Sequence, residues 1–169
     1  MGNLTDLDHL NADLSLQATT HNMRFATAAL DRDTRRMIRI PDGIKASGTL
    51  QATDGSYHAD LTTQVGRGNV HVIGRYDMTT KGFLANVTAR QLPLGQILPT
   101  SGLTPLTATV EVRGNGFDFL SSSTMFTAKA DIDQLSFDQL CLDCTQIAST
   151  LKNGTLTGHL NSDNSQLHG

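Results

Sequence analysis

Apolar and polar residues alternate along most of the chain. In the first run, Leu10, Ala12, Leu14, Leu16 and Ala18 fall on one side, and the residues between them are polar. The same period of two recurs in seven further runs: 44–52, 57–65, 70–76, 83–89, 106–112, 126–132 and 156–160. Alternation of this kind is typical of β-strands with one buried and one solvated face, which belong mostly to antiparallel sheets.

Glycine-containing pairs punctuate these runs and predict hairpin turns between them. They are Asp42-Gly43, Asp54-Gly55, Gly66-Arg67-Gly68, Lys81-Gly82, Asn115-Gly116 and Asn153-Gly154. Glycine favours such turns because it reaches positive φ without a side-chain clash. The sequence therefore predicts an all-β fold with about ten strands in one long antiparallel meander.

Three segments interrupt the alternation. Residues 92–99 carry prolines at both ends and apolar residues at 94, 97 and 98, which predicts a short helix or loop crossing the apolar side of the sheet. Residues 116–124 are expected to bulge or loop. The charged stretch 31–36 is expected to be a solvated turn before a strand at 37–40.

These elements fit a single unit over residues 1–169. It consists of a first strand set at 3–91, the interruption at 92–103 and a second set at 104–169. Residues Met1 and Gly2 are interpreted as an expression remnant, and both ends are expected to be cut from a longer protein, so that the lack of a signal segment is uninformative.

A flat sheet of this size with one bare apolar face would be insoluble. It must roll up, pair with another sheet or hold something apolar. The composition excludes only a few classes of binding partner. The net charge is −3, which gives no basic footprint for nucleic acid, and no apolar run is long enough for a membrane-spanning helix.

The cysteine pair Cys141 and Cys144 has CxxC spacing but no second ligand pair at the spacing of a zinc site. If residues 140–144 are extended, the two side chains point to opposite faces. Structural thiols are the favoured interpretation, with a disulfide or a metal site as alternatives, and no functional metal or cofactor is expected.

No other set of residues assembles an active site, so the chain is expected not to be an enzyme. The six histidines are scattered, and His58 and His71 lie on the polar sides of their runs. The serine run at 121–123 lacks a nucleophile elbow. Asp131 and Asp133 share one polar strand face without further carboxylates, which indicates solvated surface.

Several segments resemble the TamB-type proteins of Gram-negative bacteria. They are residues 40–50 and 54–61, residues 82–87 leading into 92–99, and the stretch from Leu106 through the Gly114-Asn115-Gly116-Phe117-Asp118-Phe119 motif, which is similar to central repeats of the Bacteroidota branch. The likeness covers most of residues 40–162. It rests on glycine, proline and alternation.

The resemblance implies an internal piece of a periplasm-spanning protein anchored in the inner membrane. Such proteins carry a long β-sheet curled into a trough with an apolar interior. They are implicated in phospholipid transport to the outer membrane and, with an outer-membrane barrel partner, in outer-membrane protein assembly. The chain shows neither the N-terminal anchor nor a partner-docking segment of that family.

On this interpretation the apolar face binds phospholipid acyl chains. The groove-lining residues, one from each of six central strands, are Leu50, Leu61, Val72, Val87, Val110 and Ile132. A charge at Val110 is expected to block lipid, whereas one at Thr109, which points outward, is expected to be silent. The alternative is a closed β-sandwich or β-solenoid adhesin or binding module without a conduit.

Overall fold

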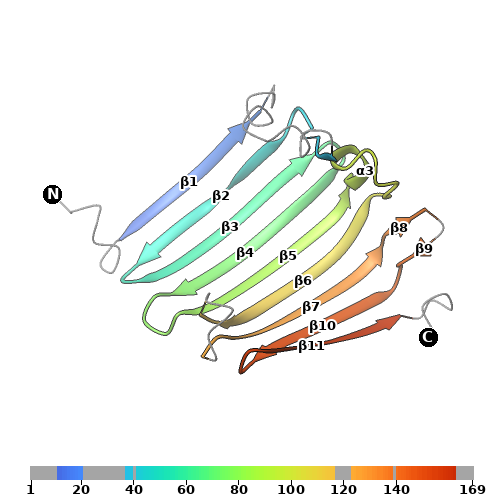
Figure 1. The fold of residues 1–169 in the computed structure, drawn as a ribbon. Coiled ribbons are helices and arrows are strands. Elements are labelled where there is room, and N and C mark those ends of the chain that lie inside the picture. The colour runs from blue at the N-terminus through green and yellow to red at the C-terminus, as the bar shows by residue number, and fades with distance from the viewer. Residues whose placement is uncertain (1–10, 21–36, 40, 117–122, 139, 163–169) are drawn as a thin grey trace.

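The computed structural model describes residues 11–20, 37–39, 41–116, 123–138 and 140–162. They form an all-β fold with one large antiparallel sheet, a small two-stranded sheet and one short helix (Figure 1). The elements in chain order are β1 (Ala12–Thr19), β2 (Lys45–Thr53), β3 (Ser56–Val65), β4 (Gly68–Asp77), β5 (Gly82–Leu92), α3 (Leu94–Ile97), β6 (Leu106–Asn115), β7 (Met125–Gln134), β8 (Ser136–Phe137), β9 (Leu140–Cys141), β10 (Thr145–Lys152) and β11 (Thr155–Ser162).

The large sheet is a meander, as the sequence predicts. Its nine strands lie in the order β1-β2-β3-β4-β5-β6-β7-β10-β11, and every neighbouring pair is antiparallel. Strands β5 and β6 pair directly although α3 lies between them in the chain. The interruption at 92–103 therefore leaves the sheet continuous.

Two of the predicted turns have the geometry that best suits a two-residue hairpin. Asp54 and Gly55 have φ of 44° and 77°, and Asn153 and Gly154 have φ of 53° and 70°. Positive φ at both central residues defines a type I′ turn, whose twist matches that of the flanking strands. The Asp-Gly and Asn-Gly signals are confirmed at both places.

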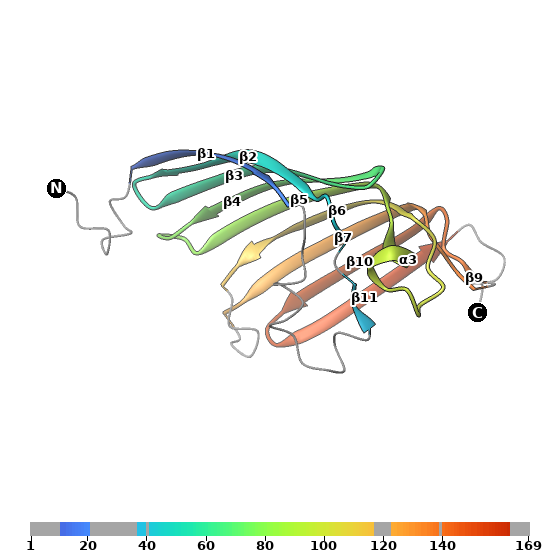
Figure 2. The ribbon, with the colours of Figure 1, turned by 90° about the horizontal axis from the view of Figure 1, so that it is seen from above.

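The sheet is open. It twists along its length, as Figure 2 shows, but it is neither closed nor strongly curled. Its first and last strands, β1 and β11, do not pair with each other, as closure into a barrel would require. No second large sheet packs on the described strands, so the closed-sandwich alternative lacks its second layer in this part of the chain.

Helix α3 confirms the predicted helical turn, and it lies at the strand ends where β5 finishes (Figure 1). Leu98 N–H donates to the carbonyl of Leu94 at 2.7 Å, and Arg39 N–H donates to the carbonyl of Ile97, also at 2.7 Å. Residues 37–39 are not a strand, so this part of the sequence prediction is wrong. The backbone of Arg39 pairs with the end of α3 instead of with a neighbouring strand.

The hairpin β8–β9, which the sequence did not predict, is attached to the loop after α3. Thr104 N–H donates to the carbonyl of Ser136 at 3.0 Å, and Ser136 N–H donates to Thr104 Oγ1 at 2.8 Å. Leu103 and Phe137 form an isolated β-bridge. Most of the irregular stretch expected at 116–124 lies outside the described residues.

Asp77 organises the turn between β4 and β5. Its Oδ1 accepts hydrogen bonds from Thr80 N–H at 2.7 Å and from Thr80 Oγ1 at 2.8 Å. The backbone bond, followed by the hydroxyl bond, lowers the pKa of Asp77 from its ordinary value of 3.8. Because the pKa is depressed in the folded state, the stabilisation is present above pH 3.8 and is lost as the pH falls through the folded-state pKa.

We therefore expect Asp77→Ala to lower the melting temperature at neutral pH and to have a shrinking effect as the pH falls below 3.8. Thermal unfolding followed by circular dichroism across this range measures the difference. Asp133→Ala, at an exposed position of β7, is the matched control. A deficit for Asp77→Ala that stays constant down to the lowest pH would contradict this role for the carboxylate.

Candidate functional site

The strand register lines up one apolar residue from each of the nine strands. Residues paired across neighbouring strands point to the same face of a sheet, so the register defines a row that crosses the whole sheet. In order from β1 to β11, this central row is Leu16, Gly48, Leu61, Val72, Val87, Val110, Ala130, Ile147 and Leu160. It contains no polar side chain.

Three further rows on the same face extend this surface toward both ends of the strands. One row is Leu14, Leu50, Ala59, Gly74, Ala85, Val112, Ala128, Ser149 and Gly158; the next is Ala12, Ala52, Tyr57, Tyr76, Phe83, Gly114, Phe126, Leu151 and Leu156; and the row on the other side is Ala18, Ala46, Thr63, Val70, Ala89, Ala108, Ile132, Thr145 and Ser162. We call these four rows the apolar face. None of their side chains is charged.

All six predicted groove-lining residues belong to the apolar face. Leu61, Val72, Val87 and Val110 are consecutive members of the central row. Leu50 and Ile132 lie one row away from it, on opposite sides. Pattern reasoning placed each residue on the correct side of its strand but could not tell which residues stand next to one another.

The last two residues of the central row, Ile147 and Leu160, have large side chains, but neither was among the groove-lining residues predicted from the sequence. Ile147 comes from β10, and Leu160 from β11. The signal for β10 was present, because Ile147 and Leu151 flank Ser149 at a spacing of two, but the run is short. Leu160 was recognised as part of an alternating run and not as part of the groove.

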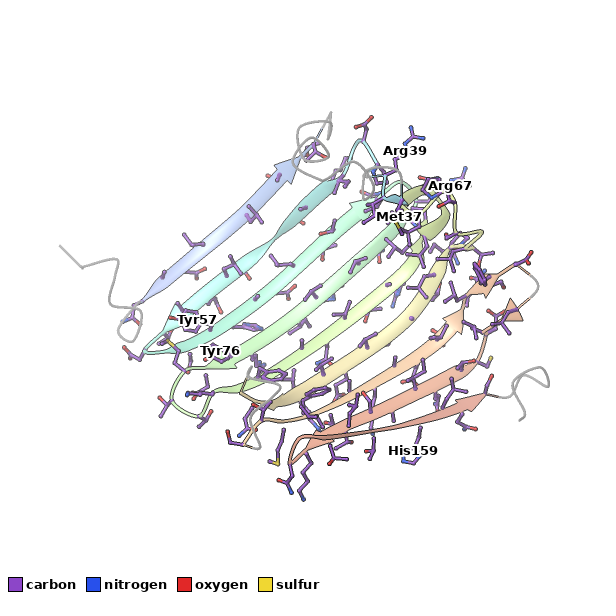
Figure 3. All side chains as sticks on the ribbon, in the orientation of Figure 1. Met37, Arg39, Tyr57, Arg67, Tyr76 and His159 are labelled. Carbon is purple, nitrogen blue, oxygen red and sulfur yellow. The ribbon has the colours of Figure 1, made fainter. Side chains whose placement is uncertain are left out.

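An aromatic cluster occupies the apolar face near the β4–β5 turn. It consists of Tyr57, Tyr76, Phe83 and Phe126. These residues belong to the same row and come from four strands, β3, β4, β5 and β7. The rings of Tyr57 and Tyr76 lie with their centroids 6.2 Å apart, and Figure 3 shows these two tyrosines side by side at the lower strand ends. The residues that line a concavity of about 890 Å³ include this cluster and Leu151, together with residues at neighbouring positions of the same strands such as Arg75, Arg113 and Lys152.

The apolar face is exposed over its flanking strands. The exposed fraction is 59% for Leu14 and 44% for Leu16 on β1, and it reaches 64% for Leu156 and 56% for Leu160 on β11. Burial on this face is confined mostly to small side chains such as Ala89 and Ala108. Contiguous exposed apolar surface of this kind marks a binding surface in a soluble protein.

The opposite face carries the charges of the central strands. Glu111 and Lys129 are cross-strand partners there, and His71 Nε2 lies 2.8 Å from Asp60 Oδ1. His58 is on this face as well, so the predicted placement of both histidines is confirmed. They are half-buried among their neighbours. The sheet is therefore two-sided, with one solvated and one apolar surface.

The two cysteines lie at the end of β9 and in the turn that leads to β10. Cys141 ends β9, whereas Cys144 is in a turn with φ of 55°, so the assumption of an extended segment at 140–144 is wrong. The turn is held by Leu135, whose N–H donates to Asp143 Oδ1 and whose carbonyl accepts from Leu142 N–H, both at 2.8 Å. No disulfide joins the pair. Within the described ranges, no three His, Cys, Asp or Glu side chains are grouped as metal ligands would be.

Over the described residues, the structure has no helix whose length and hydropathy would let it cross a bilayer. In comparisons with known proteins, no family model, no curated protein and no solved structure matches this chain.

Proposed function

We propose that the apolar face binds the acyl chains of phospholipids, and that the chain is an internal segment of a TamB-like protein carrying lipid across the periplasm. One observation carries this proposal. A surface without a charged side chain crosses all nine strands, is exposed at both flanks and has a charged, solvated face behind it. A lipid chain needs such an uninterrupted apolar surface and no catalytic group.

The energy of acyl burial is large enough to drive binding. Each CH₂ group removed from water contributes about 0.8 kcal/mol, so a chain of about 16 carbons that is fully shielded gains on the order of 12 kcal/mol. An open face shields only one side of the chain, and the gain on this sheet is a fraction of that value. The absence of polar groups along the central row means that a chain can slide without passing a strong local trap.

The dimensions fit an acyl chain lying along a row. Nine strands spaced about 4.8 Å apart give a row about 38 Å long. One leaflet of a bilayer is about 15 Å deep in hydrocarbon, half of the core thickness. The central row is therefore more than twice as long as one acyl chain, and it allows movement from one end to the other.

In the full-length protein, further strands on either side extend this sheet and curl it into a trough with the apolar face inside. The charged face is then the outer wall, in contact with the aqueous periplasm. Figure 2 shows that the sheet is twisted, and twist that accumulates over more strands gives a long sheet such curvature. An anchor in the inner membrane and a barrel partner in the outer membrane complete the assembly. The segment itself has a non-enzymatic role.

The test is a direct measurement of bound lipid. We expect protein purified from Gram-negative cells to release phospholipid on solvent extraction, in an amount comparable to the amount of protein, as quantified by mass spectrometry. Delipidated protein is expected to regain phospholipid from vesicles of phosphatidylethanolamine and phosphatidylglycerol. Lipid at the level of a β-protein without an exposed apolar face, purified in the same way, would contradict the proposal.

A further inference from the structure

The row of the apolar face that holds the aromatic cluster changes in polarity along its length. From β3 to β10 its side chains are two phenols, two phenyl rings separated by a glycine, and one aliphatic group. We call this stretch the aromatic row, and it consists of Tyr57, Tyr76, Phe83, Gly114, Phe126 and Leu151. The central row has only aliphatic side chains and glycine, so it has no comparable direction.

The aromatic row lies along an elongated concavity. The residues that line this concavity of about 890 Å³ come from β2 through β7 and from β10, so it runs across the strands. Small-molecule sites typically have volumes of about 300–1,000 Å³. The strands from β3 to β10, spaced about 4.8 Å apart, give the row a length of about 24 Å. The hydrocarbon of one bilayer leaflet is about 15 Å deep, so one extended acyl chain and its ester fit within this length.

Burial and hydrogen bonding follow the same direction as polarity. Leu151 is only 7% exposed, whereas Tyr57 and Tyr76 are half-buried. The Tyr57 hydroxyl donates a hydrogen bond to Met78 Sδ at 3.4 Å, which directs the phenol toward the turn between β4 and β5. Figure 3 shows both tyrosines at these lower strand ends. Tyrosine suits such a boundary because its ring is apolar and its hydroxyl is polar.

We propose that the aromatic row binds one acyl chain of a phospholipid in a fixed direction, with the ester at Tyr57 and Tyr76 and the methyl end at Leu151, an inference that rests on the proposed function above. The second chain of the same lipid lies parallel to the first on the neighbouring rows, toward the central row.

The polar atoms of the aromatic row select an acyl ester over a protein segment. Its only polar side-chain atoms are the two tyrosine hydroxyls, and both are at one end. A peptide laid along the row would bury backbone N–H and C=O groups without partners. An acyl ester is polar at one end only, which matches the row, and the uncharged row receives it without desolvating an ion.

The two tyrosines make the direction of the chain measurable. Tyr57 and Tyr76 are the only tyrosines in the sequence, which contains no tryptophan, so the strong ultraviolet fluorescence comes from one end of the row. Delipidated protein is loaded from vesicles of phosphatidylglycerol whose acyl chains carry a nitroxide either near the ester or near the methyl end. The vesicles are removed by centrifugation, and bound lipid is quantified by mass spectrometry. At equal bound lipid, we expect the label near the ester to remove most of the tyrosine emission and the other label to leave most of it.

Two kinds of failure are distinguishable in this experiment. Protein that retains no lipid would contradict the proposed function and, with it, the directional site. Protein that retains lipid but keeps its full tyrosine emission with both labels would show that the chain lies elsewhere on the apolar face, which overturns the directional site alone. Equal quenching by the two labels, or stronger quenching by the label near the methyl end, would also overturn it.

A reporter at the other end of the row carries the opposite expectation. Leu156 is the cross-strand partner of Leu151 and is 64% exposed, so Leu156→Trp adds an indole there without overpacking. Tryptophan is excited selectively at wavelengths that tyrosine does not absorb. We expect the label near the methyl end to quench this emission and the label near the ester to leave most of it. The same order of quenching as for the tyrosines would contradict a fixed direction.

Phe83→Ala and Leu84→Ala separate lipid binding from packing. Both residues are half-buried on β5, but Leu84 lies on the opposite face, between Arg75 and Arg113. We expect Phe83→Ala to weaken lipid retention about tenfold, because an aromatic contact with the acyl chain is lost. Leu84→Ala, which also loses a large apolar side chain, is expected to retain lipid as the wild type does. Equal retention by the two variants would show that the aromatic row serves packing alone.

Discussion

Val110→Lys is expected to remove most of the phospholipid that the wild-type protein retains. Val110 lies in the middle of the central row, between Val87 and Ala130. An ammonium group there either stands in the path of the acyl chain or must be desolvated against it, and both reduce binding. Lipid extraction and mass spectrometry on matched amounts of protein measure the effect, which we expect to be at least tenfold.

Thr109→Lys is the matched control. Thr109 is the neighbour of Val110 on the same strand, but it is exposed on the opposite face, with Thr88 and Asp131 as cross-strand partners. Lysine is preferable to aspartate at this position because Asp131 would repel a second carboxylate. We expect normal lipid content and an unchanged melting temperature for this variant.

The unfolding transition separates a binding surface from a closed core. Val110 is half-buried on an open sheet, so Val110→Lys is expected to lower the melting temperature only modestly. A lysine in a closed core would cost several kcal/mol and would abolish cooperative unfolding. Loss of the transition in Val110→Lys, or equal lipid in the two lysine variants, would contradict the assignment of this face.

Gly114→Ala is expected to destabilise the fold, because a side chain at this position of the apolar face has no room. A Cβ at this position would overlap the Met125 carbonyl oxygen and lie 2.6 Å from the Phe126 Cβ. Gly114 is the cross-strand partner of Phe83 and Phe126. Overpacking of this kind costs about 1–3 kcal/mol.

Gly74→Ala shows whether the effect is specific. Gly74 also lies on the apolar face of a central strand, but there an added Cβ approaches only the Ala59 Cβ, at 3.9 Å. We expect no loss of stability, since alanine fits and restricts the unfolded chain. For a chain of this length, 1 kcal/mol corresponds to about 2–4 °C in melting temperature. Similar melting temperatures for the two variants would contradict the packing described around Gly114.

Local signals were sufficient to predict most of the sheet. Alternation placed the apolar residues of eight of the nine long strands on their correct sides, and the pairs Asp54-Gly55 and Asn153-Gly154 marked true hairpins, whereas no strand precedes Asp42-Gly43 in the described residues. Strand β10 was not predicted because its alternating run holds only Ile147 and Leu151 as large apolar residues. The hairpin β8–β9 was not predicted because each of its strands is only two residues long and because it depends on contacts with Thr104, which is distant in the sequence.

The alignment of residues from different strands could not be predicted from the sequence, because it depends on non-local pairing. The side of Leu61 or Val72 follows from local alternation, but their alignment in one row follows from register, which turns and long-range packing set. The aromatic cluster is of the same kind, since Tyr57 and Phe126 are far apart in the chain. Residues 37–39 looked like a strand by composition, yet the backbone of Arg39 is bound to the end of α3.

Photo-crosslinking along alternating positions tests the central claim most directly. A benzophenone side chain is placed in turn at Val72, Val87 and Val110 on the apolar face, and at the adjacent residues Ile73, Asn86 and Thr109 on the opposite face. Each variant is irradiated with vesicles of phosphatidylethanolamine and phosphatidylglycerol. The account predicts lipid adducts that alternate with a period of two, present at the first three positions and absent at the other three. Adducts at both sets of positions, or at neither, would contradict it.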